Sequence, residues 1–270
     1  MNNAAASVME REWRRYEPGE RIARFVVYAA IVAAVVMSIR TVEVIPEFIL
    51  DAPEQVVDLL KRMWPPDVAS YPKEIHAALL DSLHIATVGT VLGVAMALPF
   101  GFLAARNVTP WPWLNWMARL ILISARSVNT LVFALFFVAV FGPGALAGTL
   151  AIAFHSIGFV GRLFSEALEN TSPGPIEALR AAGAPSASVI TYGYWPQVVP
   201  AFWSLVLFRW DINVRESIVL GLVGAGGVGM ALDNALNLFQ WNRVAMVLLA
   251  ILGVVIAAEV AVTYIRKKII

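Results

Sequence analysis

The stretch Glu-Ala-Leu-Arg-Ala-Ala-Gly at residues 177–183 is a short, polar, helix-forming segment in an otherwise apolar chain, and Pro196 follows its glycine thirteen residues later. Long apolar windows flank it on both sides, at Ala145–Phe164 and Val198–Val223. A short amphipathic helix between membrane spans has no obvious role unless something soluble docks on it. The stretch therefore predicts a membrane protein that carries a docking helix outside the bilayer.

Composition supports the membrane class. Of 270 residues, 59% are apolar and 14% are charged, and the mean hydropathy is +0.73, whereas soluble domains carry about a quarter charged residues. A membrane span needs about 20 mostly apolar residues. Windows of this kind are Ile22–Ile39, Ala77–Ala105, Trp116–Phe141, Ala145–Phe164, Val198–Val223 and Val244–Tyr264. We predict an all-α membrane protein with about six transmembrane helices.

Residue usage excludes several classes of function. The chain has no cysteine, which excludes disulfides, a thiol nucleophile and cysteine metal sites. The net charge is +1, and no basic run suggests nucleic acid. His76, His84 and His155 have no carboxylate at a spacing that completes a metal site, so we interpret them as packing or interface residues. No serine, histidine or carboxylate cluster predicts an enzyme.

The charges between the windows orient the bundle. Residues 40–75 carry an acidic excess, whereas Arg106, the 177–183 stretch and the basic tail 266–268 fall on the other side. Basic residues favour the cytoplasmic side. With six spans, both termini and the 177–183 stretch are then expected in the cytoplasm.

We divide the chain after residue 75. Residues 1–75 would hold a cytoplasmic N-terminus, the first transmembrane helix and an external amphipathic segment, and residues 76–270 the core, with the docking loop at about 165–197. Four prolines are expected to cut the external segment into short lengths, namely Pro46, Pro53, Pro65 and Pro66. Its apolar residues follow helical spacing. Two interpretations stay open: a helix lying at the membrane interface, or part of a docking face for an external protein.

The fifth window carries charges in its middle, where they are costly. At 100° per residue Arg209, Asn213 and Glu216 share one face, while Asp211 and Arg215 share another and can pair. Two interpretations are open. The charges neutralise one another between helices, or an arginine faces a water-filled path and its planar guanidinium binds an oxyanion. The sequence does not choose between Arg209 and Arg215.

The third window carries a second polar patch. Arg119, Arg126 and Asn129 are expected on one stripe of a continuous helix, and Ser127 and Thr130 lie beside them. The patch would either line a pathway or form hydrogen bonds between helices.

A glycine-rich run follows the fifth window, with Gly224, Gly226, Gly227 and Gly229. Its letters match a dinucleotide fingerprint, but no strand precedes it, so we exclude nucleotide binding. In a membrane bundle such a run lets a helix break and backbones approach closely. We predict a gate or hinge here, with plain packing as the alternative.

From about residue 77 onward the chain resembles the phosphonate-transporter permease family of ABC importers. The resemblance is carried by residues 99–107, 163–200 and 209–229. Within the second run, Glu177, Ala178, Gly183 and Pro196 match the spacing of the family's cytoplasmic coupling loop. The positions that depart from the general coupling-loop pattern are Leu179, Gly193 and Trp195, and Asn129-Thr130 stands where members often carry proline and an acidic residue.

The resemblance implies a type I importer permease in the bacterial inner membrane, paired with a second copy or a related permease. An external phosphonate-binding protein would deliver the cargo, and two cytoplasmic ATPase subunits would bind ATP and magnesium. This chain would bind no cofactor and catalyse no reaction. It would carry phosphonate, phosphite or phosphate; the alternatives are an ABC importer permease for another small substrate and an ATP-independent anion carrier.

The expected site residues fall into three groups. The coupling residues are Glu177, Ala178, Ala181, Gly183 and Pro196. The substrate pathway residues are Arg126, Asn129, Arg209, Asn213, Arg215 and Glu216. The gate or hinge residues are the four glycines of the run after the fifth window.

Overall fold

The computed structural model describes residues 18–42 and 46–269, and every regular element within them is a helix. The chain divides into two compact units, residues 1–58 and residues 59–270. The predicted division after residue 75 stays a prediction. The predicted cytoplasmic N-terminus, residues 1–17, lies outside the described residues.

The first unit consists of α1 (Pro18–Thr41) and most of α2 (Pro46–Met63). α1 has charged residues near its ends and a long apolar middle, whereas α2 is amphipathic. Pro53 lies inside α2, so the prediction that it cuts this segment is wrong. A proline forfeits one helical hydrogen bond, and the apolar stripe keeps its helical period on both sides of Pro53.

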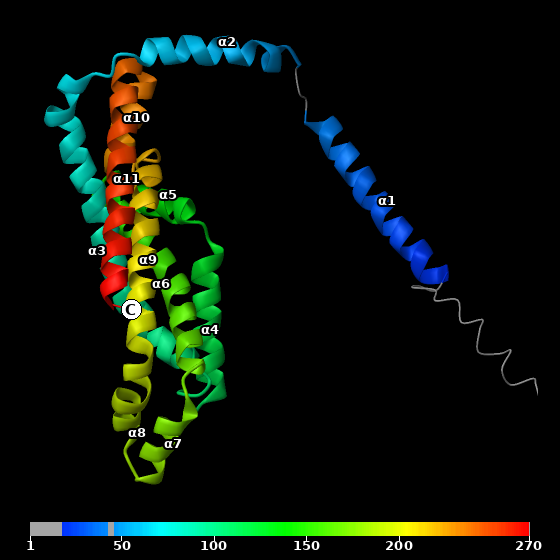
Figure 1. Cartoon of the computed structure of the whole chain (residues 1–270), viewed down its shortest axis with the longest axis vertical. Helices are drawn as coiled ribbons and strands as arrows, with labels where there is room; N and C mark the ends of the chain where they lie inside the picture. The colour runs from blue at the N-terminus through cyan, green and yellow to red at the C-terminus, as the bar shows by residue number, and fades with distance from the viewer. Residues whose placement is uncertain (1–17, 43–45, 270) are drawn as a thin grey trace, which may run out of the picture. The chain divides into compact units, whose positions relative to one another are not determined.

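The second unit is a helical bundle (Figure 1). Its elements are η2 (Val68–Ser70), η3 (Tyr71–Ile75), α3 (His76–Ala104), α4 (Pro112–Ser127), α5 (Thr130–Phe141), α6 (Ala145–Glu169), α7 (Pro173–Ala181), α8 (Ser186–Ser188), η4 (Val189–Tyr194), α9 (Trp195–Gly221), α10 (Val228–Asn237) and α11 (Trp241–Ile269). Within this unit α7 and α8 lie at one end and α10 lies towards the other (Figure 1).

α6 is the central helix of the bundle, because it packs against α3, α4, α5 and α9. Its closest neighbour is α3, and glycine allows that approach. A Cβ atom added to Gly93 of α3 would lie 2.6 Å from Cβ of Ser156 on α6. Small residues at a helix contact bring backbones together and gain dispersion energy, which drives helix association where lipid removes the hydrophobic incentive.

Four described helices or helix runs are long and apolar enough to cross a membrane, at Gly19–Thr41, Val68–Ala104, Ala145–Glu169 and Trp241–Lys268, and the pair α4 and α5 would make a fifth. α9 is 27 residues long, but its central charges keep it out of this set. Each predicted window is thus helical over most of its length. The all-α membrane class is confirmed.

The third window is not one straight span, contrary to prediction. α4 ends at Ser127, α5 begins at Thr130, and the two axes meet at 87°. Val128 and Asn129 are extended, and the side chain of Asn129 accepts a hydrogen bond from Leu131 N (2.9 Å). An asparagine that caps the next helix competes with continuing the previous one. Asn129 therefore does not share a helical stripe with the arginines of α4.

Candidate functional site

A pocket of about 340 Å³ opens at the break between α4 and α5. The residues that line it are Asn129, Thr130, Leu131, His155, Arg215, Glu216, Val219 and Leu220. They come from the start of α5, the middle of α6 and the charged part of α9. The break thus turns what would be helix interior into the wall of a cavity that polar and apolar side chains line together, which we name the break pocket.

The N-terminus of α5 borders the break pocket. Its first backbone N–H groups have no helical partners, and the helix dipole places partial positive charge there. Asn129 satisfies one of these groups through its bond to Leu131 N. A helix start of this kind favours anions.

Behind the pocket wall lies a buried arginine. Arg209 is only 2% exposed, and its Nε donates to Ser156 Oγ (3.0 Å). Its terminal nitrogen donates to Glu216 Oε2 (3.2 Å), which also accepts from Thr130 Oγ1 (3.0 Å). The guanidinium also lies 5.3 Å from the ring centroid of Phe159. Arg209 is held on several sides, so its role in this geometry is to fix Glu216 at the pocket.

Asn213 extends the same buried network. Its Nδ2 donates to Thr90 Oγ1 (2.7 Å) and lies 3.3 Å from Ser156 Oγ. Its Oδ1 is buried without a hydrogen-bond partner among the described residues. The predicted shared face of Arg209, Asn213 and Glu216 is therefore real, but only Glu216 reaches the pocket.

Arg215 faces the pocket and pairs with Asp211, as the spacing predicted. Its side chain is 47% exposed, whereas that of Asp211 is 11% exposed. The Asp211 carboxylate holds one side of the planar Arg215 guanidinium, which carries several hydrogen-bond donors. Of the two arginines that the sequence left open, Arg215 lines the pocket and Arg209 does not.

Arg126 and His155 depart from expectation in opposite directions. Arg126 is exposed near the end of α4 and does not line the break pocket. His155, interpreted from sequence as a packing residue, does line it. Its Nδ1 lies 3.0 Å from the carbonyl oxygen of Val128, and because a carbonyl only accepts, Nδ1 is the donor. The sequence carried no signal for this position, because the histidine contacts the pocket only through the break in another helix.

The glycine-rich run forms a tight corner between α9 and α10. Gly224, Gly226 and Gly227 have positive φ angles, and Val228 N donates to Ser82 Oγ (2.8 Å). A Cβ on Gly229 would collide with the carbonyl oxygen of Ile218. The four glycines do not line the break pocket. Their role as a gate stays a prediction.

Within the predicted coupling loop, α7 is followed by a glycine in the left-handed conformation. Gly183 has φ +74°, its N–H donates to Arg180 O (3.0 Å), and Ala184 N donates to Leu179 O (3.0 Å). These two bonds are the Schellman arrangement, which needs a residue that tolerates positive φ. The backbone at the end of α7 thus requires a glycine at position 183.

α7 rests on the bundle through one face only. Ile176 is buried against the core, whereas Glu177, Ala178 and Ala181 are exposed. A Cβ atom on Gly193 would lie 3.3 Å from Leu179 Cδ1. Gly193, one of the positions that depart from the general coupling-loop pattern, therefore lets α7 pack closely against η4. The exposed face is free to receive a partner.

Polar side chains fix this loop to the spans. Ser172 N donates to Gln197 Oε1 (2.9 Å), and Gln197 Nε2 donates to Gly193 O (2.7 Å). Tyr194 Oη donates to Asn107 O (3.0 Å), which joins the loop to the connection between α3 and α4. Pro196 is exposed in the first turn of α9.

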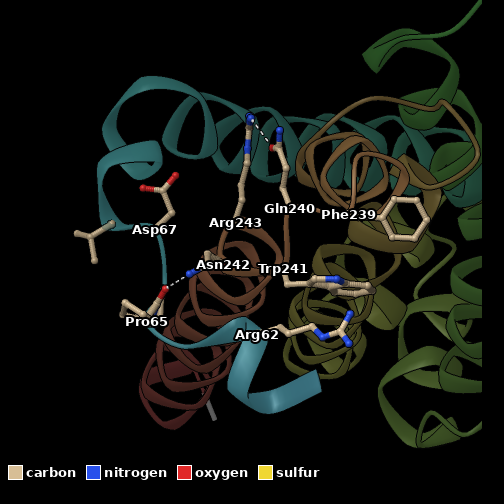
Figure 2. A pocket seen from close by; sticks show the side chains of 10 residues that line it. Arg62, Pro65, Asp67, Phe239, Gln240, Trp241, Asn242 and Arg243 are labelled. Carbon is tan, nitrogen blue, oxygen red and sulfur yellow. Dashed lines mark hydrogen bonds between the residues drawn. The ribbon is translucent and has the colours of Figure 1, made fainter. Parts of the chain in front are cut away.

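A larger open pocket, of about 900 Å³, lies where the chain following α2 meets the connection between α10 and α11. Figure 2 shows its polar lining, with Asn242 Nδ2 donating to Pro65 O (2.7 Å) and Arg243 beside Gln240. Arg243 also pairs with Glu74. None of the predicted pathway residues lines this pocket.

The sequence matches the family described as the binding-protein-dependent transport system inner membrane component over residues 97–270. It is 39% identical over 219 residues to the phosphite transport system permease protein PtxC of Stutzerimonas stutzeri, covering 81% of this chain and 79% of that protein. It is 38% identical over 234 residues to the phosphate-import permease protein PhnE of Mycolicibacterium smegmatis, covering 87% of this chain and 44% of that protein. The aligned region thus spans less than half of the second relative.

Solved structures show the same fold. A chain of the inward-facing MetNI methionine ABC transporter superposes with a TM-score of 0.62 at 22% identity, covering 71% of this chain and 94% of that chain. A chain of a bacterial ABC transporter that imports alginate gives a TM-score of 0.62 at 12% identity, covering 92% and 98% respectively. At these identities the likeness is one of architecture.

Proposed function

The chain belongs to the family of binding-protein-dependent transport system inner membrane components, the permeases of ABC importers, and on this premise we propose that its cargo is phosphite, phosphonate or phosphate. The observation that carries the proposal is the 39% identity to a phosphite permease across most of both chains. The break pocket supports it, since an arginine and a helix N-terminus suit an oxyanion.

The charges of the break pocket suit passage rather than tight binding. Glu216 is paired with Arg209 and Arg215 with Asp211, so the formal charges balance. The excess positive potential then comes from the start of α5 and the donors of Arg215. A transport site must bind well enough to admit its cargo and weakly enough to release it.

The proposed assembly follows from the family. Two permeases, identical or related, would form the core in the bacterial inner membrane, with both termini of this chain in the cytoplasm. An external binding protein would deliver the oxyanion, and two ATPase subunits with ATP and magnesium would bind the exposed face of α7. This chain would have no catalytic site of its own.

α7 would transmit the motion of the ATPases. It contacts the bundle through Ile176, and Tyr194 and Gln197 hold the rest of its loop to the spans. A force on the exposed face of α7 would thus reach α3 and α9 together. Rigid-body movement of this type switches packed helices between two states.

The test is uptake by the purified complex in proteoliposomes, with its binding protein outside and ATP inside. Radiolabelled phosphate, phosphite and methylphosphonate are offered in turn, with methionine as the control for another cargo class. We expect ATP-dependent uptake of at least one phosphorus oxyanion. Uptake of methionine alone would overturn the cargo, and oxyanion uptake without ATP would overturn the importer mechanism.

A further inference from the structure

α2 separates its polar and apolar side chains completely around the helix axis. At about 100° per residue, all of its acidic and basic residues and Gln55 fall within an arc of about 120°. The remaining arc is apolar. Its large exposed side chains are Phe48, Ile49, Leu50, Val56, Val57, Leu59 and Leu60, with exposed fractions between 37% and 78%. Such a face is stable only when something apolar covers it.

Connectivity determines how α2 lies with respect to a membrane. The candidate span of α1 ends at Thr41, five residues before α2 begins at Pro46. α2 ends at Met63, and the next candidate span begins at Val68. Five extended residues reach at most about 18 Å, whereas an 18-residue helix is about 27 Å long. Because both spans meet the same membrane surface, α2 cannot stand upright between them and must run along that surface.

The charges of α2 indicate which component of the surface it meets. Its polar arc carries Glu47, Asp51, Glu54 and Asp58 against Lys61 and Arg62, a net charge of two minus four, or −2. Anionic headgroups would repel this arc, so electrostatic attraction does not hold the helix. What remains is burial of the apolar arc in the acyl boundary of the lipid.

We propose that α2 is an interfacial helix whose apolar arc is buried in the lipid leaflet at that surface, with its acidic arc facing the water. The occupant of the apolar face is therefore lipid rather than a second copy of the chain or an external protein. The proposal depends on α1, α2 and the span after them, and does not rest on the proposed cargo.

The natural absence of cysteine makes the proposal testable at single positions. Val56→Cys and Leu60→Cys place a spin label on the apolar arc, and Glu54→Cys and Asp58→Cys are the matched controls on the polar arc of the same turns. The full chain is reconstituted in phosphatidylethanolamine vesicles. Collision rates are then measured with oxygen, which concentrates in lipid, and with a water-soluble nickel chelate.

We expect the ratio of oxygen to nickel collisions to be at least about tenfold higher at Val56→Cys and Leu60→Cys than at the two controls. The ratio should be unchanged at 1 M salt, because screening does not weaken apolar burial. Shielding of the apolar positions from both reagents would overturn the proposal in favour of a protein cover. Free access of the nickel chelate to all four positions would overturn it in favour of a helix in water. None of these readouts requires transport, so failure here leaves the proposed cargo untouched.

Discussion

The coupling end and the break pocket are built in opposite ways. At the coupling end, Gly183 and the exposed face of α7 are determined by local backbone geometry, and little packs on them. Behind the wall of the break pocket, Arg209 and Asn213 are buried and bonded to residues far apart in the chain. Under the proposed function, the difference teaches that function and stability separate at the coupling end and coincide at the break pocket. Four substitutions test this contrast, in order of decreasing expected effect on stability.

Arg209→Gln should have the largest effect. Removing the guanidinium leaves Glu216 and Ser156 without a charged partner, and breaking a buried pair costs about 3–5 kcal/mol. Detergent-solubilised chain should unfold at clearly lower denaturant concentration, measured by circular dichroism. Arg215→Gln is the control, because its partly exposed pair contributes about 1 kcal/mol or less. Equal unfolding of the two variants would show that the arginine behind the wall is not structural.

Gly183→Val should weaken α7 locally. A side chain in the left-handed region costs about 1–2 kcal/mol, and no atom lies within 4 Å to add a clash. Amide hydrogen exchange at the end of α7 should accelerate about 5- to 30-fold while global unfolding changes little. Gly174→Ala, with equally open surroundings and no positive φ, should exchange at the wild-type rate. Acceleration spread over the spans would contradict a local defect.

Asn129→Ala should remove the cap of α5 and cost about 1 kcal/mol. The same denaturation measurement should register a small loss, and uptake should fall because the pocket wall loosens. Ser127→Ala is the neighbouring control, since its hydroxyl only bonds back to Ile123 O in its own helix. A larger loss in the serine variant would place the cause of the break elsewhere.

Glu177→Gln should leave stability within about 0.5 kcal/mol, because the side chain is exposed. Under the proposed function it should nevertheless weaken binding of the ATPase subunit about tenfold, measured by titration of the detergent complex. Glu259→Gln removes an equally exposed carboxylate from α11 and should bind normally. Unchanged binding in both variants would remove this residue from the coupling face.

Sequence reasoning predicted the helix at the 177–183 stretch better than the break pocket for a physical reason. The stretch 177–183 is a local motif, and its helix end follows from one glycine. Helical spacing also placed Arg209, Asn213 and Glu216 on one face, because periodicity survives within a single helix. These are the features that nearby residues alone decide.

The break between α4 and α5 was missed because its local signal is weak. Asn129 contributes about 1 kcal/mol as a cap, which a long apolar window conceals. Once the chain turns there, His155 joins the pocket from another helix. A residue whose role depends on a bend elsewhere cannot be found by spacing within its own helix.

The contact between Gly93 and Ser156 limits how this sequence can diverge. Ser156 cannot become larger because α3 leaves no room, and loss of its hydroxyl would remove one hydrogen-bond partner from each of Arg209 and Asn213. A mutation at either position is therefore disfavoured. Descendants of this chain should keep both residues, which makes positions 93 and 156 a lineage marker for the buried network.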